Sequence, residues 1–293
     1  MYSKKEYRKL SMLTSEGEGF YLAPEAINIK CKGTFEQHEE INVYAIKGDS
    51  KEKVGKLMLY NNARIPKMKL TFVDYITESR KFKRTFDYEK FLKTSSLNQA
   101  LIQVEIEKDF EFDLRKYRIQ DIDVNIFINR VENNQTVNFL DNFYNFFYKY
   151  NKNNVLKNNK GAIVKIGNEN INKTYVFLTT MQQGTARGVG SQSNLILFGL
   201  AESDFNDILV HELGHTLGLS HTFETSDSFD NTNIGKKVET FEFLQGYTAN
   251  FMDYKIAKSL NMINRTLINE NLRFKYFLKF QWDIMRKDKS LTY

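Results

Sequence analysis

The sequence predicts an α+β protein in two parts, a small all-β module followed by a larger domain of mixed strands and helices. The chain of 293 residues is long enough for about two domains, and 41% of its residues are apolar, which is ample for a hydrophobic core. Apolar and polar residues alternate every second position over much of residues 19–77, as in half-buried strands. From about residue 97 onward, apolar strands are interleaved with segments of helical periodicity.

The first part is predicted to be an antiparallel β sandwich or barrel over residues 1–85. Four or five short alternating runs are separated by turn-rich pieces such as 48–52 and 61–66. The charged stretch 79–90 is the predicted link to the second domain. The excess of six positive charges lies in residues 1–95, where 19 Lys and Arg face 13 Asp and Glu. So diffuse an excess is typical of a solvated surface, and no nucleic-acid partner is expected.

The second domain, over residues 86–293, is predicted to alternate strands with helices. Its helix over 137–150 carries aromatic residues at helical spacing, which indicates packing against a core. A glycine-rich stretch precedes the last apolar strand, and a further helix follows near the end of the sequence. The predicted elements in order are strand 100–107, helix 137–150, strands 161–167, 174–180 and 194–199, a helix over 203–217 and a final helix over 274–286.

The segment SDFNDILVHELGHTLGLSH, residues 203–221, carries the chemistry. Three of the four histidines of the chain fall in it. His211 and His215 are four residues apart on one helix face, so both imidazoles can reach one zinc ion at about 2.0–2.1 Å. Gly218 is predicted to end the helix in a left-handed conformation and to turn the backbone so that His221 becomes a third ligand. Three neutral nitrogens and one open position predict a catalytic zinc site.

Glu212 is adjacent to a predicted ligand but points in another direction from the helix. That placement suits a general base acting on a zinc-activated water, so the sequence predicts hydrolysis with Glu212 as the base. An alternative is a zinc site whose third ligand is a downstream glutamate, Glu239 or Glu242, in place of His221.

These residues resemble a known family. HELGHTLGLSH is similar to the long zinc-binding signature of the metzincin metallopeptidases, and Met252 in TANFMDY, 31 residues after His221, resembles their methionine turn. The pieces HTF and NFMDY are most similar to the pappalysin branch, although this chain has no cysteine after Cys31. The resemblance covers about residues 97–290. It implies a zincin-like catalytic domain with a mixed five-stranded sheet and long helices.

The resemblance implies a zinc endopeptidase acting on proteins or peptides, and it implies roles for residues around the metal. Met252 would form an apolar floor under the histidines, and Tyr254 would be a fifth ligand or an oxyanion donor, with a packing role as the alternative. Asp253 is expected to fix the turn through backbone hydrogen bonds. The stretch Gly184–Gly190 matches the cleft-facing edge strand that a peptide would join as an antiparallel strand, with a plain hairpin loop as the alternative.

The sequence also bears on calcium binding, cellular location and partners. Glu224, Asp227 and Asp230 could bind calcium or form a solvated acidic loop. With no apolar signal and no stretch of membrane-spanning length, we expect no membrane span, and secretion by a route independent of a signal peptide or, alternatively, a cytoplasmic location. The layout resembles bacterial type VI secretion cargo metallopeptidases, which implies an exported effector or toxin and a carrier or secretion-machinery partner for residues 1–95. The alternative is an inactive zincin-fold binding protein docked through its β module.

Overall fold

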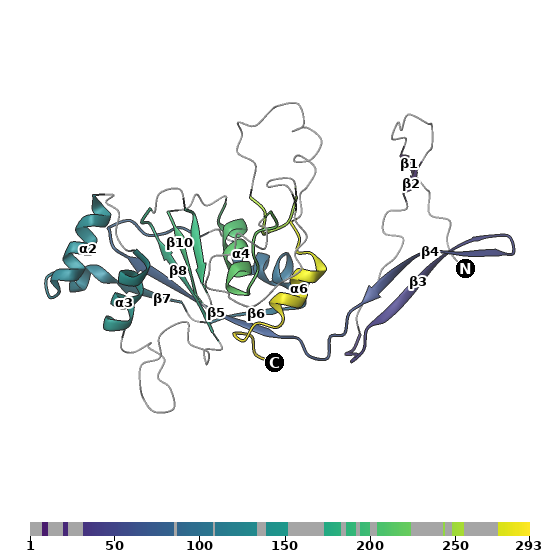
Figure 1. The fold of residues 1–293 in the computed structure, drawn as a ribbon, viewed down its shortest axis with the longest axis horizontal. Helices are drawn as coiled ribbons and strands as arrows, with labels where there is room; N and C mark the ends of the chain where they lie inside the picture. Colours follow the sequence, from purple (N-terminus) through teal and green to yellow (C-terminus); the bar gives the residue numbers. More distant parts are fainter. Residues whose placement is uncertain are drawn as a thin grey trace. The chain divides into compact units, whose positions relative to one another are not determined.

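The computed structural model divides the chain into two compact units, Met1–Arg64 and Ile65–Tyr293 (Figure 1). None of the helices that the structure describes is both long and apolar enough to cross a membrane. The predicted strand over 161–167 lies outside the described residues. The structure describes residues 8–10, 20–22, 32–84, 87–107, 109–133, 139–151, 173–182, 186–191, 194–199, 204–223, 243, 248–254 and 275–293.

The first unit contains two antiparallel strand pairs. Strand β1 (Arg8–Leu10) pairs with β2 (Phe20–Leu22), and β3 (Glu39–Lys47) pairs with β4 (Ser50–Leu59) in a hairpin. Within the described part of this unit the strands form two separate two-stranded sheets, not the predicted sandwich or barrel. The prediction counted a further strand, over 67–76, that belongs to the other unit.

That strand, β5 (Lys67–Ile76), moves the boundary between the units from residue 85 to Arg64. It lies inside the sheet of the second unit, with hydrogen-bonded strands on both sides, and most of its residues are buried. The stretch 79–90, predicted as the link, also belongs to the second unit, and its Arg84 forms ion pairs with Asp74 and Asp109. The first unit has only 11 Lys and Arg against 9 Asp and Glu, so most of the positive excess of residues 1–95 lies in the second unit.

The sheet of the second unit is mixed, as predicted. Its strand order is β6-β5-β8-β10-β9, and β7 pairs with β5 beyond the end of β6. All neighbouring strands are parallel except β9, which is antiparallel to β10. Because β6 and β7 pair with successive parts of β5, the sheet formed by the described residues is five strands wide. The bounds are β6 Gln103–Ile106, β7 Phe110–Asp113, β8 Thr174–Thr179, β9 Gly188–Ser191 and β10 Asn194–Phe198.

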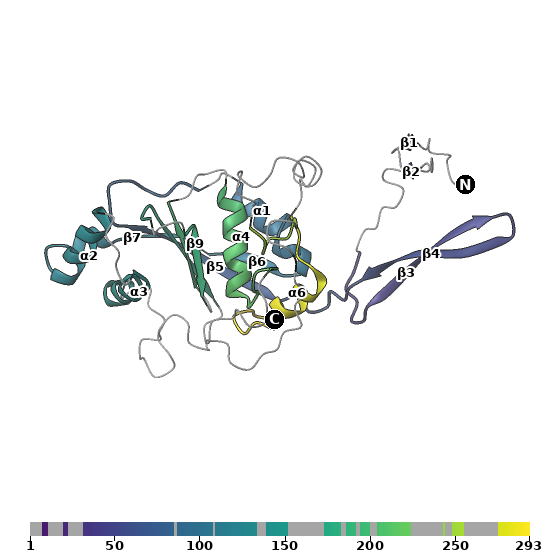
Figure 2. The same cartoon turned by 45° about the horizontal axis from the view of Figure 1, so that its top comes forward.

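Helices cover both faces of this sheet, so its strands β8 and β10 are buried at every position (Figures 1 and 2). On β8, Val176 and Leu178 enter one core, while Tyr175 and Phe177 enter the other. The first core contains side chains of α1, η1, α4 and α6, and the second contains side chains of α2 and α3. The bounds are α1 Tyr88–Thr94, η1 Leu97–Ala100, η2 Leu114–Tyr117, α2 Ile122–Glu132, α3 Phe139–Tyr150, α4 Phe205–Thr216 and α6 Lys279–Met285.

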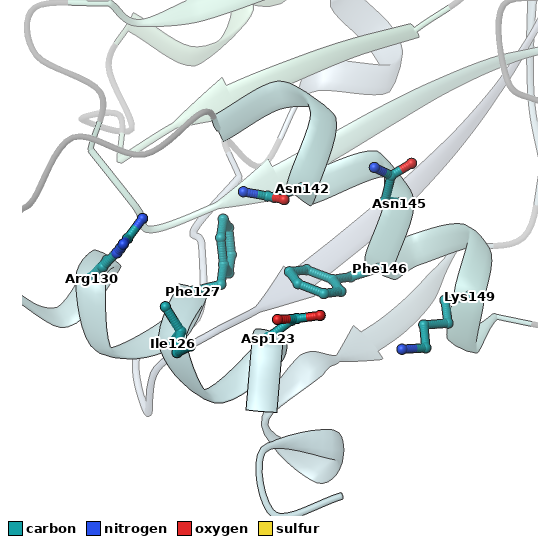
Figure 3. Close-up of a pocket in the computed structure, with 8 residues that line it drawn as sticks. All are labelled: Asp123, Ile126, Phe127, Arg130, Asn142, Asn145, Phe146 and Lys149. Carbon is teal, nitrogen blue, oxygen red and sulfur yellow. The ribbon is translucent and has the colours of Figure 1, made fainter. Parts of the chain in front are cut away.

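The second core is aromatic and confirms the predicted packing role of the helix from Val137. On α3, Phe143 stacks on Tyr75 with ring centroids 3.7 Å apart, and Phe147 meets Phe177 edge-on at 4.9 Å. A pocket of about 370 Å³ opens between α2 and α3 (Figure 3). It contains none of the predicted site residues, and its lining consists of Asp123, Ile126, Phe127, Arg130, Asn142, Asn145, Phe146 and Lys149.

The last residues of the sequence return to the first strand of the second unit. Thr292 forms an isolated antiparallel bridge with Lys67 at the start of β5. The amide of Lys67 donates to the carbonyl of Thr292 over 2.7 Å, and the amide of Thr292 donates to the carbonyl of Lys67 over 3.0 Å. Residues 67 and 292 of this unit therefore lie side by side.

Asp121 joins α2 to α3 and gives a test of the second core. Its buried carboxylate accepts hydrogen bonds from the backbone N–H groups of Asp123 and Val124 at the start of α2, and from Tyr150 on α3. It also pairs with Lys149 over 2.6 Å, and this hydrogen-bonded ion pair, with the other donors, holds the pKa of Asp121 well below its ordinary value.

Replacing Asp121 with alanine should lower the free energy of unfolding at pH 7 by about 1–2 kcal/mol, because α2 loses its N-cap and the ion pair. A carboxylate with a depressed pKa stabilises the fold fully above its unfolded pKa of about 3.9 and loses that contribution as the pH falls toward the folded value. Urea unfolding at pH 7 and pH 3 should therefore show a smaller difference at pH 3. Asp123→Ala, in the same turn but exposed, is the control and should change little. Equal effects of the two variants at pH 7 would contradict the assignment.

Candidate metal centre

The helix α4 presents His211 and His215 from a well-packed support. Its residues Phe205, Leu209 and Leu213 are fully buried in the first core, which holds the opposite side of the helix against the sheet. Burying three such side chains fixes the position and rotation of the helix about its axis. Both histidines are half-buried on the side away from these residues.

The end of α4 turns back in a Schellman motif. Gly218 has a φ of +86°, a left-handed conformation that favours glycine. The amide of Gly218 donates to the carbonyl of His215, and the amide of Leu219 donates to the carbonyl of Gly214, both over 3.0 Å. This turn reverses the chain direction and brings His221 to the two histidines of the helix.

The three imidazoles converge on one point. The Nε2 atoms of His211, His215 and His221 lie 3.2, 3.2 and 3.1 Å apart. Tetrahedral bonds of about 2.0–2.1 Å to one zinc ion place its ligand atoms about 3.3 Å apart, so the triangle fits zinc closely. Among the described residues these three form the one His, Cys or carboxylate cluster that could hold a metal ion.

Backbone carbonyls select the metal-binding tautomer of two of these histidines. The Nδ1–H of His211 donates to the carbonyl of Phe251 over 2.7 Å, and that of His215 donates to the carbonyl of Leu219 over 2.8 Å. A carbonyl oxygen only accepts, so Nδ1 carries the proton and Nε2 keeps a free lone pair. Burial, with His215 nearby, lowers the pKa of His211 to about 3, which keeps the ring neutral at pH 7. The free lone pairs of His211 and His215 therefore both point to where one cation would lie.

Glu212 lies beside the cluster, on the side of α4 that faces strand β9. Its side chain is buried, with 7% of its surface exposed. Burial raises the pKa of Glu212 to about 7, while a hydrogen bond from the amide of Gly190 acts in the opposite direction. A carboxyl group with a pKa near neutrality can both accept and return a proton at pH 7.

Met252 packs directly beneath the helix that carries the ligands. It is fully buried in the first core. A methyl group added at Gly214, between His211 and His215 in the chain, would lie 2.3 Å from the sulfur of Met252. Only glycine leaves room for the sulfur there, and the sequence alone did not predict this role of Gly214. Asp253 accepts hydrogen bonds from the amide and hydroxyl of Thr248 over 2.8 and 2.6 Å, as predicted for a residue that fixes this turn.

A buried amide pair that the sequence did not predict ties this turn to α6. The Nδ2 of Asn250 donates to the Oε1 of Gln281 over 2.7 Å, and the Nε2 of Gln281 donates back to the Oδ1 of Asn250 over 3.2 Å. That Oδ1 also accepts the amide of Met252 over 2.8 Å. The next carbonyl in the turn, that of Phe251, is the one that orients His211. A buried Asn followed by a distant buried Gln gives no signal in a single sequence.

Tyr254 lies beside the histidines and is half-exposed. Its ring centroid is 4.6 Å from that of His221 and 5.6 Å from that of His211. Phe223 stacks nearly parallel to the imidazole of His221 at 5.0 Å, and its ring centroid is 5.1 Å from that of Tyr254. The sequence did not predict this contact of Phe223, which restricts the rotation of the third imidazole.

The structure describes some of the remaining predicted site residues and not others. Of the stretch Gly184–Gly190, the described part contains strand β9, which lies at the edge of the described sheet next to the metal centre. Gly184 lies outside the described residues, as do the predicted calcium ligands and the alternative zinc ligands. Those residues are Glu224, Asp227, Asp230, Glu239 and Glu242.

Comparison with known proteins identifies the segment that carries this site. Residues 199–260 match the model of a family described as Met-zincin. Mature mirolysin of Tannerella forsythia, solved in complex with a cleaved peptide, has a similar chain with 10% sequence identity and a TM-score of 0.39, covering 76% of this chain and 91% of that one. None of the curated proteins compared with the chain matches it. The family match confirms the resemblance to metzincin metallopeptidases, and the pappalysin branch stays a prediction.

Replacing His221 with alanine should weaken zinc binding at least about 100-fold, because even changes in residues that only support a metal ligand cost about 10–100-fold. Zinc affinity is measured by competition with a chromophoric chelator, and stoichiometry by elemental analysis. His38→Ala, which removes the one histidine outside the cluster, is the control and should bind zinc as the wild type does. Normal zinc binding by His221→Ala, together with loss of zinc binding in a Glu239 or Glu242 variant, would favour the site in which a glutamate is the third ligand.

Replacing Gln281 with leucine should lower the free energy of unfolding by about 1–3 kcal/mol, because the amide of Asn250 remains buried without this partner. A double-mutant cycle of Asn250→Ala and Gln281→Ala, measured by urea unfolding of the chelator-treated protein, should give a coupling energy of at least about 0.5 kcal/mol. Zinc should also dissociate faster from each single variant. Additive effects on stability and an unchanged zinc dissociation rate would show that the pair does not hold the turn.

Proposed function

We propose, from the match of residues 199–260 to the Met-zincin family model, that this protein is a zinc-dependent endopeptidase in which Glu212 acts as the general base. The observation that carries the proposal is the triangle of Nε2 atoms with sides of 3.1–3.2 Å, with a buried glutamate beside it. His211, His215 and His221 would hold the ion. Three protein ligands leave a fourth position for a reacting group, as catalytic rather than structural zinc sites do.

The proposed reaction is hydrolysis of a peptide bond. Zinc bound by the histidines would polarise the scissile carbonyl and lower the pKa of the attacking water toward about 7. Glu212 takes a proton from that water as its oxygen attacks the carbonyl carbon. The same carboxyl then gives the proton to the amine nitrogen as the carbon–nitrogen bond breaks, so Glu212 returns to its starting state.

Tyr254 is proposed as a donor to the carbonyl oxygen on which negative charge develops. Its ring lies near two of the three imidazoles and is half-exposed, so its side chain can meet both the site and a bound peptide. The neighbouring Met252 has the opposite character. It is completely buried under α4 and would contribute an apolar floor rather than a ligand.

The biological setting is a prediction from the sequence. Export as an effector, and a carrier or secretion-machinery partner for residues 1–95, are supported by the layout of the chain and its resemblance to secretion cargo. Secretion-machinery genes beside the gene for this protein would strengthen that prediction. Their absence would favour a resident cytoplasmic enzyme.

Replacing Glu212 with glutamine should leave one zinc ion bound and reduce cleavage of an unfolded protein such as casein at least about 100-fold, because the amide cannot take the proton. Glu89→Gln, an exposed substitution on α1, is the control and should cleave like the wild type. Phenanthroline should abolish wild-type cleavage, and added zinc should restore it. If Glu212→Gln cleaves as fast as the wild type, the assigned base is wrong. If the zinc-loaded wild type cleaves no member of a wide peptide library, the protein is an inactive zincin-fold binding protein.

A further inference from the structure

The strand β9 runs alongside Glu212, and two of its residues face α4. In the pairing with β10, Gly188 lies opposite Leu197 and Gly190 lies opposite Leu195, both of which belong to the first core. Val189, between them, packs against the aromatic core on the other face of the sheet. The two glycines therefore present bare backbone to the helix that carries the metal ligands.

At Gly188 the side chain of Glu212 occupies the space of a missing methyl group. A Cβ atom added there would lie 2.6 Å from the Cγ of Glu212, 2.8 Å from its Cδ and 2.8 Å from its Oε1. These distances are far below van der Waals contact, so alanine at 188 and the observed position of the carboxylate exclude each other. All three atoms belong to the reacting side chain and none to a histidine.

At Gly190 the contact is with the helix itself. A Cβ atom added there would lie 2.7 Å from the carbonyl oxygen of Glu212 and 3.1 Å from the Cβ of His215. Backbone atoms of a packed helix cannot rotate away as a side chain can. The amide of Gly190 also donates a hydrogen bond to the carboxylate of Glu212. Gly190 thus sets both the distance between strand and helix and the direction of the carboxylate.

We propose that Gly188 and Gly190 are positioning residues for Glu212, with β9 forming a cradle that holds the carboxylate in one place beside the three histidines. The catalytic role of the two glycines rests on the proposed peptidase function. Their contact with Glu212 does not depend on that function. The cradle limits the rotamers of Glu212 without a second charged group. The base therefore remains without an ion-pair partner from β9, and its position depends on the shape of the strand.

Gly188→Ala is the direct test, because its contacts are confined to the side chain of Glu212. This variant should bind one zinc ion with wild-type affinity, and its kcat for casein should fall about 100-fold, the loss expected when a reacting group moves by about 1 Å. Gly55→Ala is the matched control, a glycine in strand β4 where an added Cβ lies 3.9 Å from its nearest neighbour. It should change neither zinc binding nor kcat.

A second readout does not depend on activity. Gly188→Ala should lower the midpoint of thermal unfolding in the wild-type background but not in the Glu212→Ala background. The Glu212→Ala variant lacks the Cγ, Cδ and Oε1 atoms that the added methyl group would overlap. The double variant should therefore fold even if the single variant does not. An equal loss of thermal stability in both backgrounds would overturn the cradle, as would wild-type kcat in Gly188→Ala. If the wild type cleaves nothing, the proposed peptidase function fails, and the two thermal measurements still decide whether the contact exists.

Discussion

The metal centre depends on two backbone carbonyls, those of Leu219 and Phe251, that accept hydrogen bonds from imidazole Nδ1–H groups. Each hydrogen bond fixes a tautomer and an orientation, and together they aim the free lone pairs of His211 and His215 at one point. One carbonyl comes from the turn that ends α4, and the other comes from the methionine turn, 40 residues beyond His211. The buried amide contact between Asn250 and Gln281 holds the turn that carries the Phe251 carbonyl, so α6 supports the site although none of its residues belongs to the histidine cluster.

The features of the site that were predictable all lie within one continuous segment of the sequence. The four-residue spacing of the helical histidines, the left-handed Gly218 and the return of the chain to His221 depend only on helix geometry and on the turn that ends the helix. The parts that were not predictable depend on contacts between segments far apart in the sequence. Gly190 is needed because of a helix that follows it, and Asn250 finds its partner in a helix near the end of the sequence.

The fold, like the site, was predictable in part. Alternating apolar residues identified β5 as a strand, but a period of two does not say which sheet a strand joins, and β5 was therefore assigned to the wrong unit. The mixed sheet and the helix α3 followed correctly from their patterns. The helix α2 was missed although Val124, Phe127 and Ile128 lie on one of its faces, with a capping aspartate just before it.

The bridge between Lys67 and Thr292 has a consequence for how such a unit can be reused in evolution. Because Thr292 bonds to Lys67, the start of β5 and residue 292 lie side by side at one place in the unit. Recombination at residues 64–66 can exchange what precedes the unit, and insertion into a surface loop of a host domain can transplant it, without stretching the path between α4 and the methionine turn. A unit whose two ends are adjacent can be moved between proteins as a whole, and its histidine cluster moves with it.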